Sequence, residues 1–132
     1  MVTIQTDEVR WKDDPDTHDY PAAGNYLSLV ADEGTIKQIL RELKRAEVVH
    51  FKAKDILRAS GLPLLPADNL HVLKDLRRIM RGKRLSPVLL VRGRCQNGVP
   101  AQIADGYHRV CASYHVDENT DIPVKIAPLP EA

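Results

Sequence analysis

Residues 101–112 read AQIADGYHRVCA, and this stretch decides how the rest of the chain is interpreted. Its first four residues are typical of a strand, and Asp105 and Gly106 stand where that strand passes into a helix over about residues 106–115. The first turn of a helix carries free backbone N–H groups and the positive end of the helix dipole, which together attract an anion. The sequence therefore predicts a phosphate-binding site at this junction.

The first turn of this predicted helix carries His108 and Arg109. Cations there oppose the dipole, at about 0.3–1 kcal/mol each, so their presence is easier to understand if an anion lies among them. Arg109 offers a planar pair of donors to phosphate oxygens, and His108 donates one bond and gains charge as phosphate approaches. Gly106 lets a ligand approach the backbone. Asp105 holds a metal, orients a hydroxyl or caps the helix, and these alternatives stay open.

The same residues also have a purely structural interpretation. Aspartate is a common N-cap, glycine tolerates many junctions, and an apolar stripe on this helix packs on a sheet. The stripe consists of Tyr107, Val110, Cys111 and Tyr114. Under this interpretation His108 and Arg109 are solvated, and a five-residue pattern alone does not decide between the two.

Strands are predicted on both sides of this junction. The unbroken apolar run at 87–91 predicts a strand buried on both faces, and the Asn-Gly pair at 97–98 predicts a tight connection to the next strand. Residues 48–51 predict an earlier strand and residues 122–126 a closing one. Pro123 favours a sheet edge or a strand start for that last strand.

Helical patterns alternate with these strands. Residues 66–82 predict a helix with Asp68 or Asn69 as its cap and Gly82 at its end, and residues 54–58 predict a short helix or turn. A mixed order of strands and helices predicts an α/β (α+β) fold with a small mixed sheet and packed helices.

The N-terminal part is interpreted as an addition to this domain. An Asp-rich arm precedes a helix with Pro21 in its first turn, and a second helix carries a capping-box pattern at Thr35 and Gln38. We therefore expect an arm and helical extension over residues 1–47 and the main domain over residues 48–128.

Composition limits the function classes. The 132 residues suit one domain, and a net charge of +1 neither demands nor excludes a nucleic-acid partner. No leader and no apolar run of the roughly 20 residues that span a bilayer are found, and two cysteines suggest no disulfide framework. We expect a cytoplasmic protein without a membrane contact.

Two further groups of charged residues are interpreted as structural. Lys and Arg residues cluster between Lys74 and Arg84, around the end of the predicted helix. Positive charge is favourable at a helix C-terminus, and this effect together with solvation explains most of the cluster. Part of the cluster can face an anionic partner. His18, Asp19, His50 and His71 show no metal-ligand spacing with a third ligand nearby, so we expect surface or structural roles for them.

In order and spacing, the motifs resemble the ParB/sulfiredoxin-like superfamily over about residues 48–127. The matching segments are residues 48–53, 66–82, 85–91, 103–112 and 122–126. The resemblance implies that fold for the main domain and implies that Gly106, His108 and Arg109 bind nucleotide phosphates. Arg58 resembles a further arginine of the superfamily that reaches the nucleotide.

Three kinds of relative suggest different activities. Sulfiredoxins carry Gly-Cys-His-Arg, but Tyr107 replaces the reactive cysteine and Cys111 is expected to be packing, so we do not expect sulfiredoxin activity. Chromosome-partitioning ParB proteins carry a Gly-Glu-Arg-Arg type motif and a helix-turn-helix domain that this sequence does not supply. The free-serine kinases carry Asp-Gly-His-His-Arg, which differs from residues 105–109 only at Tyr107. Their upstream glutamate has no counterpart here, and Asp55 or Asp68 is an imperfect substitute.

The leading hypothesis is therefore a nucleotide-binding protein that takes ATP, ADP or CTP with Mg²⁺. As a phosphotransferase it would use Asp105 both toward a small hydroxyl substrate and as the metal ligand, with the phosphates held by His108 and Arg109. The alternative is a non-catalytic module in which nucleotide or another anion gates contact with a protein or nucleic acid. Direct nucleic-acid binding is a third reading, and the sequence predicts no oligomeric state.

Overall fold

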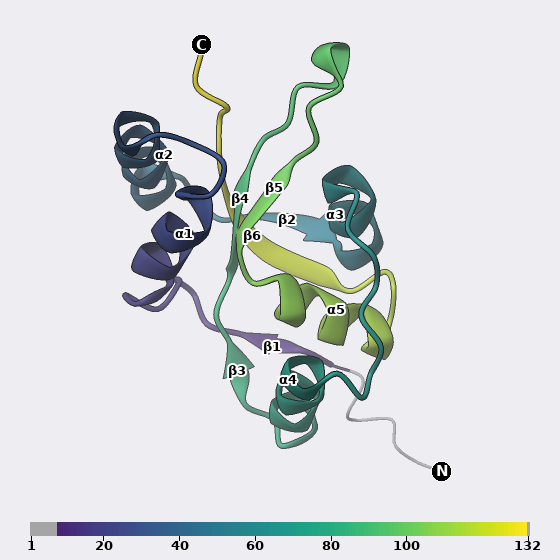
Figure 1. The fold of residues 1–132 in the computed structure, drawn as a ribbon. Helices are drawn as coiled ribbons and strands as arrows, with labels where there is room; N and C mark the ends of the chain where they lie inside the picture. The colour runs from purple at the N-terminus through teal and green to yellow at the C-terminus, as the bar shows by residue number, and fades with distance from the viewer. Residues whose placement is uncertain (1–7, 132) are drawn as a thin grey trace.

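The structure is a computed structural model that describes residues 8–131 (Figure 1). Its helices are α1 (Asp19–Leu27), α2 (Glu33–Arg45), α3 (Ala53–Ser60), α4 (Leu70–Met80) and α5 (Tyr107–Val116). Its strands are β1 (Arg10–Trp11), β2 (Val49–Lys52), β3 (Arg84–Leu85), β4 (Val88–Val91), β5 (Gln102–Asp105) and β6 (Asp121–Ala127). The predicted mixed α/β fold is confirmed.

A four-stranded sheet in the order β2-β6-β4-β5 forms the centre of the molecule. β6 runs parallel to β4, whereas β2 and β5 are antiparallel to their neighbours. Of the two alternatives for the last strand, the sheet edge is wrong, because β6 lies between β2 and β4, whereas a place near the strand start agrees with Pro123 as the third residue of β6. Pro123 is tolerated because pairing with β4 begins only at Val124, so β6 has a single neighbour at the proline and needs fewer ladder bonds there.

The sheet is covered by helices on both faces (Figure 1). Alternation along β4 directs Leu89 and Val91 into a cluster with α1 and α2, and Val88 and Leu90 into a larger cluster with α3, α4 and α5. All four residues of β4 are buried, as the continuous apolar run predicted. The domain boundary that the sequence suggested at residue 47 stays a prediction, and the helices before it supply one of the two covering layers.

The N-terminal arm makes a second, two-stranded sheet. Arg10 and Trp11 of β1 pair in parallel with Arg84 and Leu85 of β3, just before β4 begins. Short pairs of this kind are not visible as a pattern in a sequence, which predicted only an Asp-rich arm here. Its residues 1–7 lie outside the described part of the chain.

Helix caps were predicted with mixed success. Asn69 accepts hydrogen bonds from the backbone of His71 and Val72 and so caps α4, as one of the two predicted alternatives. The capping box proposed for the second helix is wrong, because α2 begins three residues earlier. Its cap is Asp32, whose carboxylate accepts a hydrogen bond from the N–H of Thr35 at 2.8 Å.

In the described part of the chain, no helix has the length and apolar character that crossing a bilayer requires.

Candidate functional site

The strand β5 passes into α5 at Gly106, as the sequence predicted. Gly106 is the N-cap residue with a φ of +110°, a conformation that favours glycine. A Cβ at this position would lie 2.8 Å from Val88 Cγ2 and 2.9 Å from Arg109 Nη2, so the packing of the protein itself requires glycine here. Among residues 8–131, no side chain caps α5. The alternative in which Asp105 caps the helix is therefore wrong, and the first-turn N–H groups remain available.

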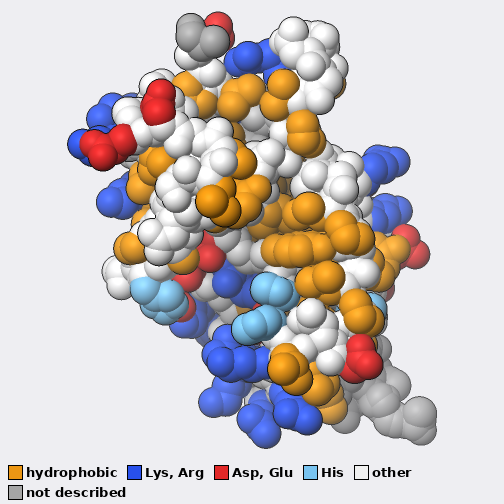
Figure 2. Space-filling view, viewed as in Figure 1, with side chains coloured by type: hydrophobic (Ala, Val, Ile, Leu, Met, Phe, Trp, Pro, Cys, Tyr) orange, Lys and Arg blue, Asp and Glu red, His pale blue; other side chains and the backbone are white. Residues whose placement is uncertain are grey.

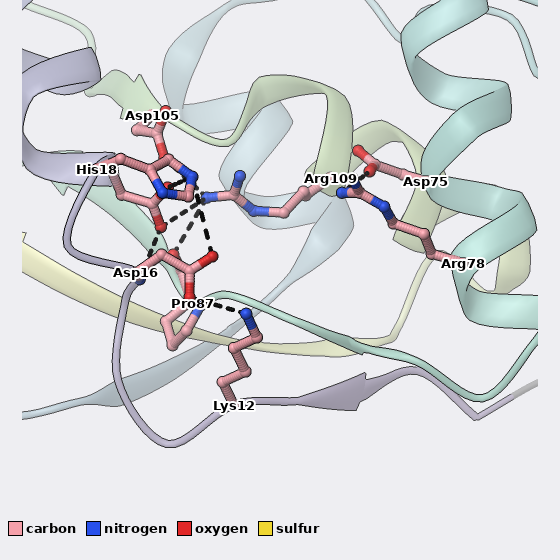
Figure 3. Close-up of polar contacts among 9 residues, drawn as sticks. Lys12, Asp16, His18, Asp75, Arg78, Pro87, Asp105 and Arg109 are labelled. Atoms are coloured by element: carbon pink, nitrogen blue, oxygen red, sulfur yellow. Dashed lines mark hydrogen bonds and ion pairs between the residues drawn. The ribbon is translucent and has the colours of Figure 1, made fainter.

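The guanidinium of Arg109 is held by oxygen atoms of the protein. Its Nη2 donates to Asp105 Oδ2 at 2.9 Å and to the Pro87 carbonyl at 3.2 Å, and it lies 4.0 Å from Asp19 Oδ2. Figure 3 shows the side chain extending from α5 toward Asp105 and Pro87. Only 16% of the Arg109 side chain is exposed, so the alternative in which Arg109 is solvated is wrong. Its Nε is buried without a hydrogen-bond partner among the described residues.

The loop before α1 brings acidic groups to this guanidinium. Asp16 pairs with Lys12 at 2.8 Å (Figure 3). His18 Nε2 lies 3.5 Å from Asp19 Oδ1. Ligand atoms of Asp16, His18 and Asp19 lie within 4.8 Å of one another, so the sequence interpretation missed a third ligand beside the histidine. The nearby Arg109 charge opposes a cation there, and we interpret the group as the partner of Arg109.

A polar pocket of about 200 Å³ opens between α4 and the start of α5. Its lining residues are His71, Lys74, Asp75 and Arg78 from α4, and Asp105, Gly106, His108 and Arg109 from the β5–α5 junction. The rings of His71 and His108 lie 4.7 Å apart. Figure 2 shows histidine side chains beside a large group of Lys and Arg side chains at the α4 end of the molecule. Lys74, Arg78 and the two histidines therefore lie beside the uncapped start of α5, together with the carboxylates of Asp75 and Asp105.

The pocket shifts the ionisation of its own groups. Burial raises the pKa of Asp105, and the charge of Arg109 opposes part of that rise. Burial also raises the pKa of Asp75, against the opposing charges of Arg109 and Arg78. Burial lowers the pKa of His108, and neighbouring His71 lowers it further. An anion in the pocket would favour protonated His108, so this histidine is suited to gain charge when an anion binds.

The structure brings together four of the five site residues that the sequence suggested. Asp105, Gly106, His108 and Arg109 share the pocket, but Arg58 does not. Arg58 lies on α3, is 85% exposed, pairs with Asp55 at 3.2 Å and lines two other cavities.

Three basic side chains of the pocket were not assigned to the site from the sequence. His71, Lys74 and Arg78 follow one another at spacings of three and four, which places them on one face of α4. That spacing was the available signal, but the charge was interpreted as a solvated helix end.

Tyr107 and Cys111 have structural positions. The Tyr107 hydroxyl donates to the Pro63 carbonyl at 2.6 Å and so ties α5 to the loop before α4. Cys111 is fully buried, and burial raises the pKa of its thiol. A buried thiol with a raised pKa forms little of the reactive thiolate, which agrees with the expected packing role.

Comparison with protein-family models, with curated proteins and with solved structures gave no match for this chain. The resemblance to the ParB/sulfiredoxin-like superfamily therefore stays a prediction, and the geometry of the pocket is the basis for assigning a function.

Proposed function

We propose that the chain binds the phosphate groups of a nucleotide in the pocket between α4 and α5. The observation that carries this proposal is the convergence of Lys74, Arg78 and two histidines on a helix start that no described side chain caps. Amide donors, a dipole and flexible cations together favour an anion with several oxygen atoms. The expected superfamily role of this junction points to the same ligand.

The size of the pocket limits what it encloses. Its 200 Å³ is below the roughly 300–1,000 Å³ of cavities that surround a whole drug-sized ligand. The phosphates would therefore lie inside, with the nucleoside largely outside. This arrangement supports strong recognition of phosphate and weak discrimination among ATP, ADP and CTP.

Arg109 has a different role from the one that the sequence suggested. Its Nη2 is already bonded to Asp105 and Pro87, so direct bidentate binding of phosphate would require breaking those bonds. In our proposal Arg109 fixes the orientation of Asp105 and adds positive charge behind the pocket. The direct phosphate contacts come from His108, Lys74, Arg78 and the first-turn amides.

Phosphoryl transfer is the catalytic extension of this proposal. Asp105 Oδ2 is bonded to Arg109, and the other carboxylate oxygen is the atom that would serve a hydroxyl substrate or Mg²⁺. Magnesium usually binds one or two carboxylates together with substrate phosphates. Lys74 and Arg78 would repel a bare cation, so the pocket fits Mg²⁺ only when the ion arrives with the nucleotide.

Calorimetric titration with ADP and Mg²⁺ tests the binding proposal. We expect the double variant Lys74→Gln/Arg78→Gln to bind ADP at least about tenfold more weakly than the wild type. The single variant His108→Gln should bind ADP at least about threefold more weakly. Each variant removes charge-assisted contacts to phosphate. Arg41→Gln, on an exposed position of α2, is the matched control and should bind as the wild type. Equal affinity in all four proteins would contradict the proposal.

A non-catalytic gating module is the second candidate, and one observation favours it. Arg77, Arg81, Lys83 and Arg84 continue the positive charge of the pocket along the end of α4 and into β3, and none forms an ion pair within residues 8–131. A nucleic-acid backbone fits such a surface. Fluorescence anisotropy of an oligonucleotide, with and without ADP, distinguishes the candidates. Salt-sensitive binding that changes with ADP, in a protein without turnover, supports gating.

A further inference from the structure

A second cavity lies on the α5 face of the sheet, apart from the pocket between α4 and α5, which we call the phosphate pocket. It measures about 370 Å³ and shares no lining residue with the pocket between α4 and α5. Its floor is Leu90 of β4 and Ile126 of β6, and Phe51 of β2 and Ile56 of α3 form its walls. We call it the α3 cleft. Its volume falls in the roughly 300–1,000 Å³ range of small-molecule sites.

Backbone contacts hold the walls of the α3 cleft in place. The N–H of Ala101 donates to the Ala59 carbonyl at 3.0 Å, which joins the end of α3 to the connection between β4 and β5. Within that connection, a Cβ on Gly93 would lie 2.5 Å from the Val99 carbonyl oxygen, so its two arms are closely packed. The cleft therefore exists before any ligand enters, and little backbone ordering opposes binding.

The rim of the α3 cleft carries charge above an apolar floor. Arg92 is exposed and forms no ion pair within the described residues, while Arg58 is paired only with Asp55. Two guanidinium groups and one carboxylate leave the rim with a net charge of +1. Lys52 and Lys54 line an adjoining cavity and add positive potential outside the cleft. A single negative charge on an apolar body matches this arrangement.

We propose that the α3 cleft binds an amphipathic monocarboxylate. An apolar chain or ring lies on Leu90 and Ile126, next to Phe51, and the carboxylate is bound by Arg92 and Arg58 at the rim. Guanidinium groups bind carboxylates bidentately, and the apolar body buries surface that water otherwise contacts. The site is independent of the phosphate pocket and of the function proposed for it.

Isothermal titration with octanoate tests this site, with acetate and octylammonium as comparison ligands. Octanoate should bind, and neither comparison ligand should bind at the same concentrations, because acetate has no apolar body and octylammonium has the wrong charge. Equal binding of octanoate and octylammonium would overturn the assignment of the rim. Tighter binding of octyl phosphate than of octanoate would overturn the choice of a carboxylate.

Variants then locate the site. We expect Arg92→Gln and Phe51→Ala, both at exposed positions, to weaken octanoate binding at least about fivefold, with Arg41→Gln unchanged as the control. His108→Gln should lower ADP affinity and leave octanoate binding intact, so the two proposals fail separately. Wild-type octanoate affinity in folded Arg92→Gln and Phe51→Ala, checked by circular dichroism, would overturn this proposal.

Discussion

The phosphate pocket and the α3 cleft both contain arginine, but the burial and the partners of the arginine differ between the two sites. In the phosphate pocket, Arg109 is 16% exposed and bonded to Asp105 and Pro87. At the α3 cleft, Arg58 is 85% exposed and has only Asp55 beside it. A buried guanidinium supported on several sides organises its surroundings, whereas an exposed one above apolar residues is free to pair with a ligand. Residue type alone therefore did not reveal which arginine is structural.

The two cavities also differ in the charge that they present. Lys74, Arg78 and Arg109 against Asp75 and Asp105 give the phosphate pocket a net charge of +1, and protonation of its two histidines raises this to +3. The rim of the α3 cleft stays at +1 because it contains no histidine. A pocket whose charge rises on binding suits a multivalent phosphate, and a fixed single charge suits a monocarboxylate.

The largest effect is expected at the glycine that the phosphate pocket is built around. Gly106→Ala should lower the free energy of unfolding by about 3 kcal/mol, because it adds backbone strain and forces Val88 and Arg109 apart. Gly98→Ala is the matched control, since its φ is +69° but nothing lies within 4 Å of the added Cβ. Gly98→Ala should lower the free energy of unfolding by about 1 kcal/mol. If urea unfolding showed that Gly106→Ala and Gly98→Ala lose equal free energy of unfolding, Gly106 would not be tightly packed.

Two aspartate variants compare the ion pairs of the two regions directly. Asp105→Asn leaves the buried Arg109 without its closest partner and should destabilise the fold by about 1–3 kcal/mol. Asp55→Asn removes the exposed pair with Arg58 and should change stability by less than about 0.5 kcal/mol. If Asp105 also serves an acceptor hydroxyl, folded Asp105→Asn protein still binds ADP but loses turnover. Similar stability losses in the two variants would contradict the contrast between the regions.

Asp75 provides a gain-of-affinity test. This carboxylate is buried in the phosphate pocket, where it repels an anionic ligand. Asp75→Asn should therefore tighten ADP binding by about threefold, while octanoate binding at the α3 cleft stays unchanged. Weaker ADP binding in a folded Asp75→Asn protein would indicate that Asp75 orients Arg78 rather than opposing the ligand.

The smallest expected effect is a pH dependence from His108. Its pKa is lowered in the folded protein, so the unfolded chain takes up the proton first as the pH falls. This histidine should therefore lower stability slightly as the pH falls through the unfolded value near 6.5. A bound anion opposes that loss, so sulfate should protect more at pH 6 than at pH 8. His108→Gln should remove most of the difference in thermal unfolding scans.

The sequence predicted the main elements of the sheet and α5 well because these depend on local patterns. A continuous apolar run identified β4, and a glycine after a strand identified the start of α5. The contact of Arg109 with Asp19 was not predictable in this way, since Asp19 lies 90 positions earlier in the chain and only the packing of α1 on the sheet brings it near. Pro123 left an edge and a strand start open for a related reason, because the pairing around a proline depends on where the neighbouring strand begins.

The inner position of β6 also bears on how the domain forms. β6 follows both of its neighbours in sequence, so β2 and β4 have no common partner until residues 121–127 join them. The pairing of β2 with β6 closes a loop of about 70 residues, and such long-range closure slows folding. During synthesis the apolar faces of the earlier strands must wait for the last strand, and in that interval they are open to contacts with chaperones or with other nascent chains.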